Sequence, residues 1–249
     1  MKKIQGMIRT ETHALRGSAT AHADLLRTVL CYRRLVRALM GIILVNFPEL
    51  SRASSKCQAV EALFHVTTGH PNPRYACVDR MFRKFPSYLR RAAIEAAFGA
   101  VSSYLSNYRR WQSGMRSHRH SQPPRMAQLP AVNPPLYAGQ CIRVSDTWRE
   151  VAIKVLRTDG TWGWSEPLAL TGRLKRLPVT QQQQALSPAL NVTAGKAWLA
   201  CPVAASRPPK GAGPRVCSVD LGINTAATCA IVDNRGTVRA RSFMTSADR

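Results

Sequence analysis

Acidic residues are scarce in this sequence. Its 249 residues include 13 Asp and Glu against 36 Lys and Arg, which gives a formal net charge of +23. The shortage of acids excludes a surface that balances its own charge, and the excess of basic residues attracts polyanions. Basic side chains that contact phosphates release counterions, so nucleic acid is the expected partner, with an anionic membrane as the alternative.

Long apolar runs and paired cysteines are also missing. The most apolar window, residues 38–47, is far shorter than the roughly 20 residues of a membrane helix, and no secretory signal follows the basic N-terminus. The seven cysteines are scattered without a CxxC pair, which argues against a zinc ribbon and a disulfide framework. We therefore expect free thiols, no zinc site, no membrane partner and a cytoplasmic location.

Residues 1–115 are expected to be a mainly helical lobe. Apolar residues recur at spacings of three and four over 25–43 and again over 89–111, which is typical of two helices with one buried face each. Aromatic residues at helical spacing usually belong to a core, and we expect this of Tyr104 and Tyr108.

The basic side chains of this lobe are expected to face a polyanion. Trp111 adjoins two arginines at a helix end and is expected to stack on a base. For any single arginine the alternative is an ordinary solvated surface. The candidate nucleic-acid-binding residues are Arg33, Arg34, Arg37, Arg83, Lys84, Arg90, Arg91, Arg109, Arg110, Trp111, Arg116 and Arg119.

Residues 116–204 are expected to combine a Pro-rich connector with a small β-barrel or half-barrel. Val151, Ile153 and Val155 alternate along one strand face, and Asp159-Gly160 is typical of a hairpin turn. A second linker, rich in Pro and Gly, separates this region from the last part of the chain.

The stretch VCSVDLGINTAATCAIVDNRGTV, residues 216–238, places Asp220 at the end of an apolar strand. Two further strands predict a three-stranded meander. A buried carboxylate is costly unless it is paired or binds a metal, and Gly222 leaves room for a ligand near the backbone. This pattern is typical of the first hairpin of the ribonuclease H-like nuclease fold and of the actin-like ATPase fold. The alternative is that Asp220 caps a turn, as we expect of Asp233.

Asp220, Gly222 and Asn224, with the hairpin that follows, resemble the first RuvC-like motif of the TnpB and type V CRISPR effector family of RNA-guided nucleases. The order of helical lobe, connector and barrel upstream is similar to that family as well. The resemblance implies an α+β fold: a helical recognition lobe inserted in, or preceding, a small wedge-like β-barrel, followed by the first strands of a ribonuclease H-like (RuvC) domain at 214–249.

The resemblance also implies the partners and the chemistry. Helical lobe and barrel would hold a guide RNA and double-stranded target DNA, while base pairing reads the sequence. Asp220 would be one of three carboxylates that hold Mg²⁺ ions for DNA cleavage, with Gly222 and Asn224 supporting the motif. The location would be the bacterial cytosol or nucleoid.

The second and third catalytic motifs of that family are absent from this sequence. We therefore expect an N-terminal portion of such an endonuclease that does not cleave DNA alone. A complementary C-terminal fragment is a further candidate partner. The first alternative is a nuclease-dead RNA- and DNA-binding regulatory protein of the same descent. The second is an actin-like ATPase, which the net charge of +23 disfavours.

Overall fold

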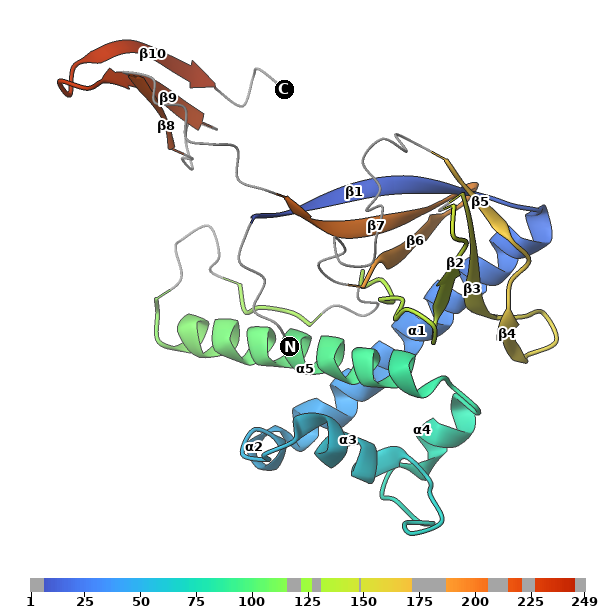
Figure 1. The fold of residues 1–249 in the computed structure, drawn as a ribbon. Helices are drawn as coiled ribbons and strands as arrows, with labels where there is room; N and C mark the ends of the chain where they lie inside the picture. Colours follow the sequence, from blue (N-terminus) through green and yellow to red (C-terminus); the bar gives the residue numbers. More distant parts are fainter. Residues whose placement is uncertain are drawn as a thin grey trace. The chain divides into compact units, whose positions relative to one another are not determined.

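The computed structural model describes residues 7–115, 122–126, 131–147, 149–171, 187–205, 215–220 and 227–244. The chain divides into two compact units, Met1–Ala205 and Ser206–Arg249. The fold is mixed α+β, with helices and a large antiparallel sheet in the first unit and a small antiparallel sheet in the second (Figure 1).

The elements have the following bounds. The helices are α1 (Ala19–Val45), α2 (Phe47–Leu50), α3 (Lys56–Phe64), α4 (Ala76–Met81) and α5 (Ser87–Gln112). The strands are β1 (Met7–Arg16), β2 (Ile142–Val144), β3 (Glu150–Leu156), β4 (Trp162–Trp164), β5 (Leu168–Thr171), β6 (Ala189–Thr193), β7 (Lys196–Ala205), β8 (Arg215–Asp220), β9 (Ala227–Asp233) and β10 (Val238–Met244).

The large sheet curls into a half-barrel. Its strand order is β2-β3-β5-β1-β7-β6, with β4 paired to β3 beside this path, and the pairings between these strands are antiparallel. Val151, Ile153 and Val155 are buried, as their alternation predicts, and β4 follows β3 through the expected hairpin turn. β1 is central, because it pairs with both β5 and β7.

Strand β1 is where the structure departs from the sequence prediction of a helical start. Its inward positions are Glu11, His13 and Leu15, and His13 is only 2% exposed. Two polar residues on the inward face hide the apolar alternation that would indicate a strand. Because β1 belongs to the sheet, the helices are inserted between β1 and β2, which is the first of the two predicted arrangements.

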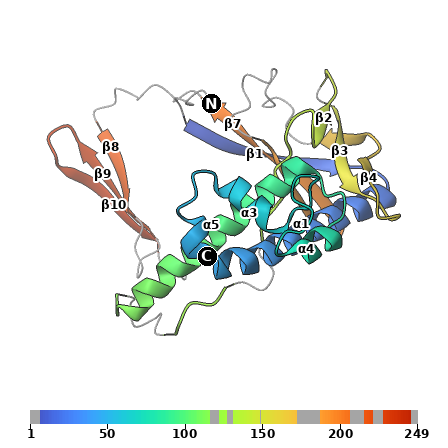
Figure 2. The ribbon, with the colours of Figure 1, turned by 90° about the horizontal axis from the view of Figure 1, so that it is seen from below.

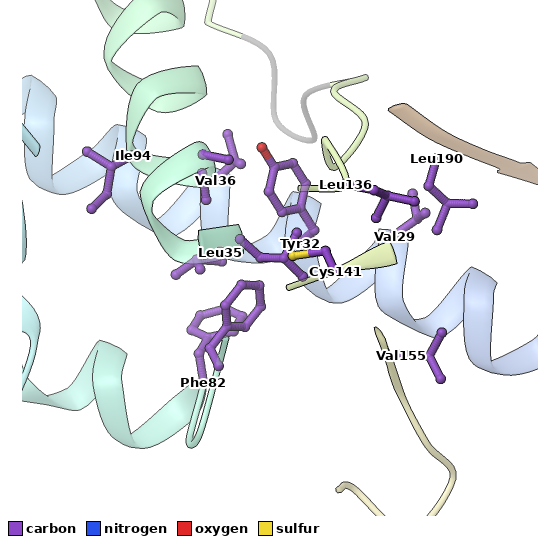
Figure 3. Packing of buried hydrophobic residues seen from close by; sticks show 14 of the residues in the cluster. Val29, Tyr32, Leu35, Val36, Phe82, Ile94, Leu136, Cys141, Val155 and Leu190 are labelled. Atoms are coloured by element: carbon purple, nitrogen blue, oxygen red, sulfur yellow. The ribbon is translucent and has the colours of Figure 1, made fainter. Parts of the chain in front are cut away.

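Helix α1 joins the helices to the sheet. Its predicted apolar face, from Leu25 to Ile43, is buried, and Figure 3 shows Val29 and Tyr32 on the side of Leu136 and Leu190, and Val36 on the side of Ile94 of α5. Thr28 accepts a hydrogen bond from the Leu156 N–H at 2.8 Å. The helix therefore shares one hydrophobic core with the half-barrel.

Helix α5 crosses α1 and continues beyond the core (Figures 1 and 2). Its buried residues lie between Leu89 and Val101. Tyr104 and Tyr108 are only half-buried, so the prediction that they belong to the core is wrong. The helical spacing continues past the point where the partner helix and the sheet provide a surface to pack on.

The connector is partly ordered against the sheet. The Arg33 guanidinium donates to the Val132 carbonyl and to Asn133 Oδ1, both at 2.9 Å. The Leu136 N–H donates to the Pro188 carbonyl at 2.7 Å, next to β6. Residues 131–136 thus extend the sheet region and are tied to α1.

The second unit is a three-stranded antiparallel sheet in the order β10-β9-β8. Its strands match the three predicted from the sequence. The turn between β9 and β10 depends on Asp233, which accepts hydrogen bonds from the Arg235 and Thr237 N–H groups at 2.9 Å and from the Arg239 guanidinium at 2.6 Å. The expectation that Asp233 stabilises a turn is confirmed.

The apolar run at 38–47 forms the end of α1 and the start of α2, where Leu39 and Ile43 are fully buried. Among the described residues, none of the helices combines the length with the apolar character that crossing a membrane requires. All seven cysteines are unpaired in the structure.

Candidate nucleic-acid interface

A basic pocket of about 560 Å³ lies between the α4–α5 loop and the β3–β4 hairpin of the first unit. The loop contributes Arg83, Lys84 and Pro86. The hairpin contributes Lys154 from β3, Gly160 and Thr161 from the turn, and Trp162 from β4. Two of the predicted nucleic-acid-binding residues, Arg83 and Lys84, are thus brought together with a third cation and an aromatic ring.

The turn of the hairpin is held by Asp159. Its carboxylate accepts from the Thr161 N–H at 2.8 Å and from the Thr161 hydroxyl at 2.7 Å. These bonds, the hydroxyl first, hold the pKa of Asp159 below its ordinary value. Gly160 has a φ of +78°, a conformation that glycine adopts without strain. The Asp159 carboxylate therefore stabilises the turn through its hydrogen bonds to Thr161.

The α4–α5 loop is fixed by aromatic contacts. Phe82 and Phe85 are buried, and their rings pack edge to face with centroids 6.3 Å apart. The centroids of the Phe85 and Trp162 rings lie 5.0 Å apart. Between the two phenylalanines, Lys84 has a φ of +56°, which is uncommon for a residue with a side chain. Such conformations persist where the surrounding structure holds them in place, as in tight turns, active sites and ligand clamps.

Among the described residues, the three cations of the pocket have no acidic partner. The side chains of Arg83, Lys84 and Lys154 form no hydrogen bond or ion pair with any described residue. Arg83 and Lys84 are exposed and Lys154 is half-buried. Like charges that converge without compensation favour an anion in the space between them.

Lys154 and Trp162 were missed as functional residues by the sequence analysis. Lys154 lies between the buried Ile153 and Val155, where a charged side chain is an ordinary outward position of a strand. No local signal marks it, since its proximity to Arg83 arises only from the tertiary fold.

The end of α5 forms a second basic and aromatic surface. The Tyr104 and Tyr108 rings lie 5.9 Å apart, and those of Tyr108 and Trp111 lie 5.4 Å apart. The neighbouring Arg109 and Arg110 are exposed. Half-buried rings beside arginines are suited to stacking on unpaired bases.

A third basic surface lies over β1 and β7. A hollow of about 590 Å³ is lined there by Arg16, Lys196, Trp198 and neighbouring residues. Trp198 is half-buried and faces Ala14 across the strand pair. The sequence analysis did not select these residues.

Two predicted interface residues have internal partners instead. Arg33 holds the connector, and Arg90 forms an ion pair with Glu61 at 3.0 Å, with both side chains mostly buried. Among the other candidates, Arg34 and Arg91 are exposed and Arg37 is half-buried. Arg116 and Arg119 lie outside the described residues.

Asp220 is the last residue of β8 and faces Thr228 across the strand pair. Gly222 and Asn224 lie outside the described residues. In the part of the chain that the structure describes, no three His, Cys, Asp or Glu side chains are grouped to hold a metal ion. One strand-end carboxylate does not by itself fit a Mg²⁺ pair, so no cleavage step follows from these residues.

A protein-family profile matches the first part of the chain. No curated protein is similar enough to the chain to count as a match. The profile of the Aq_aa04 family matches residues 9–157, which include β1, the inserted helices and the first strands of the half-barrel. Because this match covers more than half of the chain, the protein belongs to the Aq_aa04 family.

Proposed function

We propose that this chain is the nucleic-acid-binding part of an RNA-guided, Mg²⁺-dependent DNA endonuclease of the TnpB and type V effector kind. The observation that carries the proposal is the place of Asp220, at the end of the first strand of an antiparallel meander that follows a half-barrel with inserted helices. This is the order of elements that the resemblance implies.

The binding role is supported by the charge and its distribution. The net charge of +23 is accompanied by three surfaces in the first unit where cations adjoin tryptophan. Cations contact phosphates regardless of sequence, and aromatic rings stack on exposed bases. Such a surface holds a structured RNA and leaves the reading of the sequence to base pairing.

In this proposal Asp220 supplies one carboxylate toward a Mg²⁺ site. When bound, Mg²⁺ would stabilise the charge that develops on phosphate oxygens during cleavage. The residues of this chain bind and orient the nucleic acid, and the chain is not expected to cleave DNA on its own.

A nuclease-dead regulatory protein of the same descent is the second candidate. It is favoured by the lack of a metal-holding group of acids among the described residues, because the metal pair in that family needs two acids besides the one at Asp220. The two candidates share the same binding surface and differ only in cleavage.

The test is purification of the full chain at low salt, with sequencing of any bound RNA. We expect RNA of defined size, bound equally by wild type and by the Asp220→Ala variant, and no cleavage of guide-matched DNA with Mg²⁺. Protein free of RNA would contradict both candidates. Mg²⁺-dependent cleavage that Asp220→Ala abolishes would contradict the claim that the chain does not cleave alone.

A further inference from the structure

The pocket between the α4–α5 loop and the β3–β4 hairpin is built to hold one shape. The Phe85–Trp162 contact joins its two walls, and Asp159 fixes the turn through Thr161. Its volume of about 560 Å³ lies within the usual range of small-ligand sites. A pocket with fixed walls selects its occupant by size and chemistry.

The charge of the pocket selects an anion. Arg83, Lys84 and Lys154 line it, and none of the other described residues in its lining carries a carboxylate. Asp159, in the adjacent turn, accepts two hydrogen bonds from Thr161. The guanidinium of Arg83 can donate to two phosphate oxygens at once, whereas each lysine acts as a point charge.

The tryptophan adds a flat apolar surface beside these cations. Trp162 is half-buried and meets Phe85 with its ring plane tilted by 68°, so Phe85 does not stack flat on the indole ring. A base stacks on such a ring without regard to its identity. A bare inorganic anion would use the cations and leave the ring uncovered.

We propose that this pocket binds one nucleotide, with its phosphate held by Arg83, Lys84 and Lys154 and its base stacked on Trp162. The assignment rests on the proposed function, since it gives the binding site of one nucleotide of the bound nucleic acid. The same chemistry is present in a nucleotide of an RNA strand and in a free mononucleotide, and the test separates these sources.

The test measures the affinity of the full chain for a fluorescent single-stranded oligouridylate by anisotropy. The double variant Arg83→Gln/Lys84→Gln is compared with Arg80→Gln/Arg52→Gln, which removes the same charge from exposed arginines outside the pocket. We expect the pocket variant to lose roughly tenfold or more in affinity and the control less than about threefold, because two of the three cations that contact the phosphate directly are lost. Circular dichroism verifies that both variants fold.

A second arm locates the base. Oligouridylate that carries 4-thiouridine is expected to cross-link to the peptide that contains Trp162, and less so in Arg83→Gln/Lys84→Gln. Competition by AMP well below the concentration at which inorganic phosphate competes would assign the pocket to free nucleotides as well. Failure of AMP to compete, with the variant effect on RNA retained, would assign it to the strand.

Equal loss of affinity in the two double variants would overturn the proposal, as would competition by inorganic phosphate as strong as that by AMP. These outcomes differ from failure of the proposed function, in which the wild-type chain binds no RNA at all.

Discussion

The two units of the chain differ in how they use apolar side chains. In Met1–Ala205, helices and half-barrel share a core in which Tyr32 and Leu39 are at most 1% exposed. In the second unit, Ala227 is the one buried residue among those described, while Val216 and Phe243 are more than 60% exposed. A small sheet needs a covered apolar face to be stable, so the first unit should supply nearly all of the stability.

The largest expected effect is a difference in the free energy of unfolding between one substitution in the first unit and one in the second. Leu39→Ala removes a fully buried side chain and should lower the free energy of unfolding by about 2–5 kcal/mol. Val216→Ala changes a 67% exposed side chain and should change it by less than about 0.5 kcal/mol. Urea unfolding followed by circular dichroism measures both, and similar losses would show that the second unit has a core of its own.

The next comparison uses two adjacent arginines of α1. Arg33→Ala removes two hydrogen bonds to the connector and should destabilise the first unit by roughly 1–3 kcal/mol. Arg34→Ala removes an exposed cation and should leave stability unchanged while weakening RNA binding. Thermal unfolding and RNA titration of each variant test this, and a stable Arg33→Ala protein with weakened RNA binding would reverse the assignment.

A smaller effect is a loss of stability of the first unit in mild acid. Burial lowers the pKa of His13 from its ordinary value of 6.5, and Glu11 opposes this shift only in part. The fold therefore favours the neutral form of His13. The contribution of His13 to the free energy of unfolding is complete above about pH 6.5 and is lost as the pH falls toward the folded-state pKa. We expect a lower urea midpoint at pH 5.5 than at pH 7.5, and a smaller difference in His13→Gln. An unchanged difference in that variant would assign the effect to another group.

The smallest effect belongs to the second unit and to stronger acid. Hydrogen bonds to its carboxylate, that from the Thr237 N–H first, lower the pKa of Asp233 from 3.8. The turn should therefore be intact above about pH 4 and loosen as the pH falls through the lowered pKa. NMR signals of the Thr237 amide should follow this transition. In Asp233→Asn the acid step should disappear, and its persistence would show that another carboxylate controls the turn.

Elements with a continuous periodic pattern could be predicted from the sequence. The apolar face of α1 and the alternation of β3 hold over their buried lengths, because the inward positions are apolar with the exception of Thr28 in α1. Strand β1 could not be predicted this way, since His13 occupies an inward position that the sheet nevertheless buries.

Only two of the four residues of the candidate site that carry a charge or an aromatic ring could be predicted from the sequence. Arg83 and Lys84 stand out as adjacent cations at a helix start, so composition alone selects them. Lys154 and Trp162 lie far along the chain and join them through the tertiary fold, in which the Phe85 ring contacts the Trp162 ring. The role of Arg33 was hidden for the same reason, because its partners lie in the connector.

The most direct test of the central claim is the salt dependence of RNA binding by the full chain. The three pocket cations alone predict that the logarithm of the association constant falls with the logarithm of salt concentration at a slope of about −2, and steeper if other surfaces contribute. A titration of single-stranded RNA between about 50 and 200 mM salt measures this slope. Binding that is absent at the lower salt concentration, or insensitive to salt, would contradict the account.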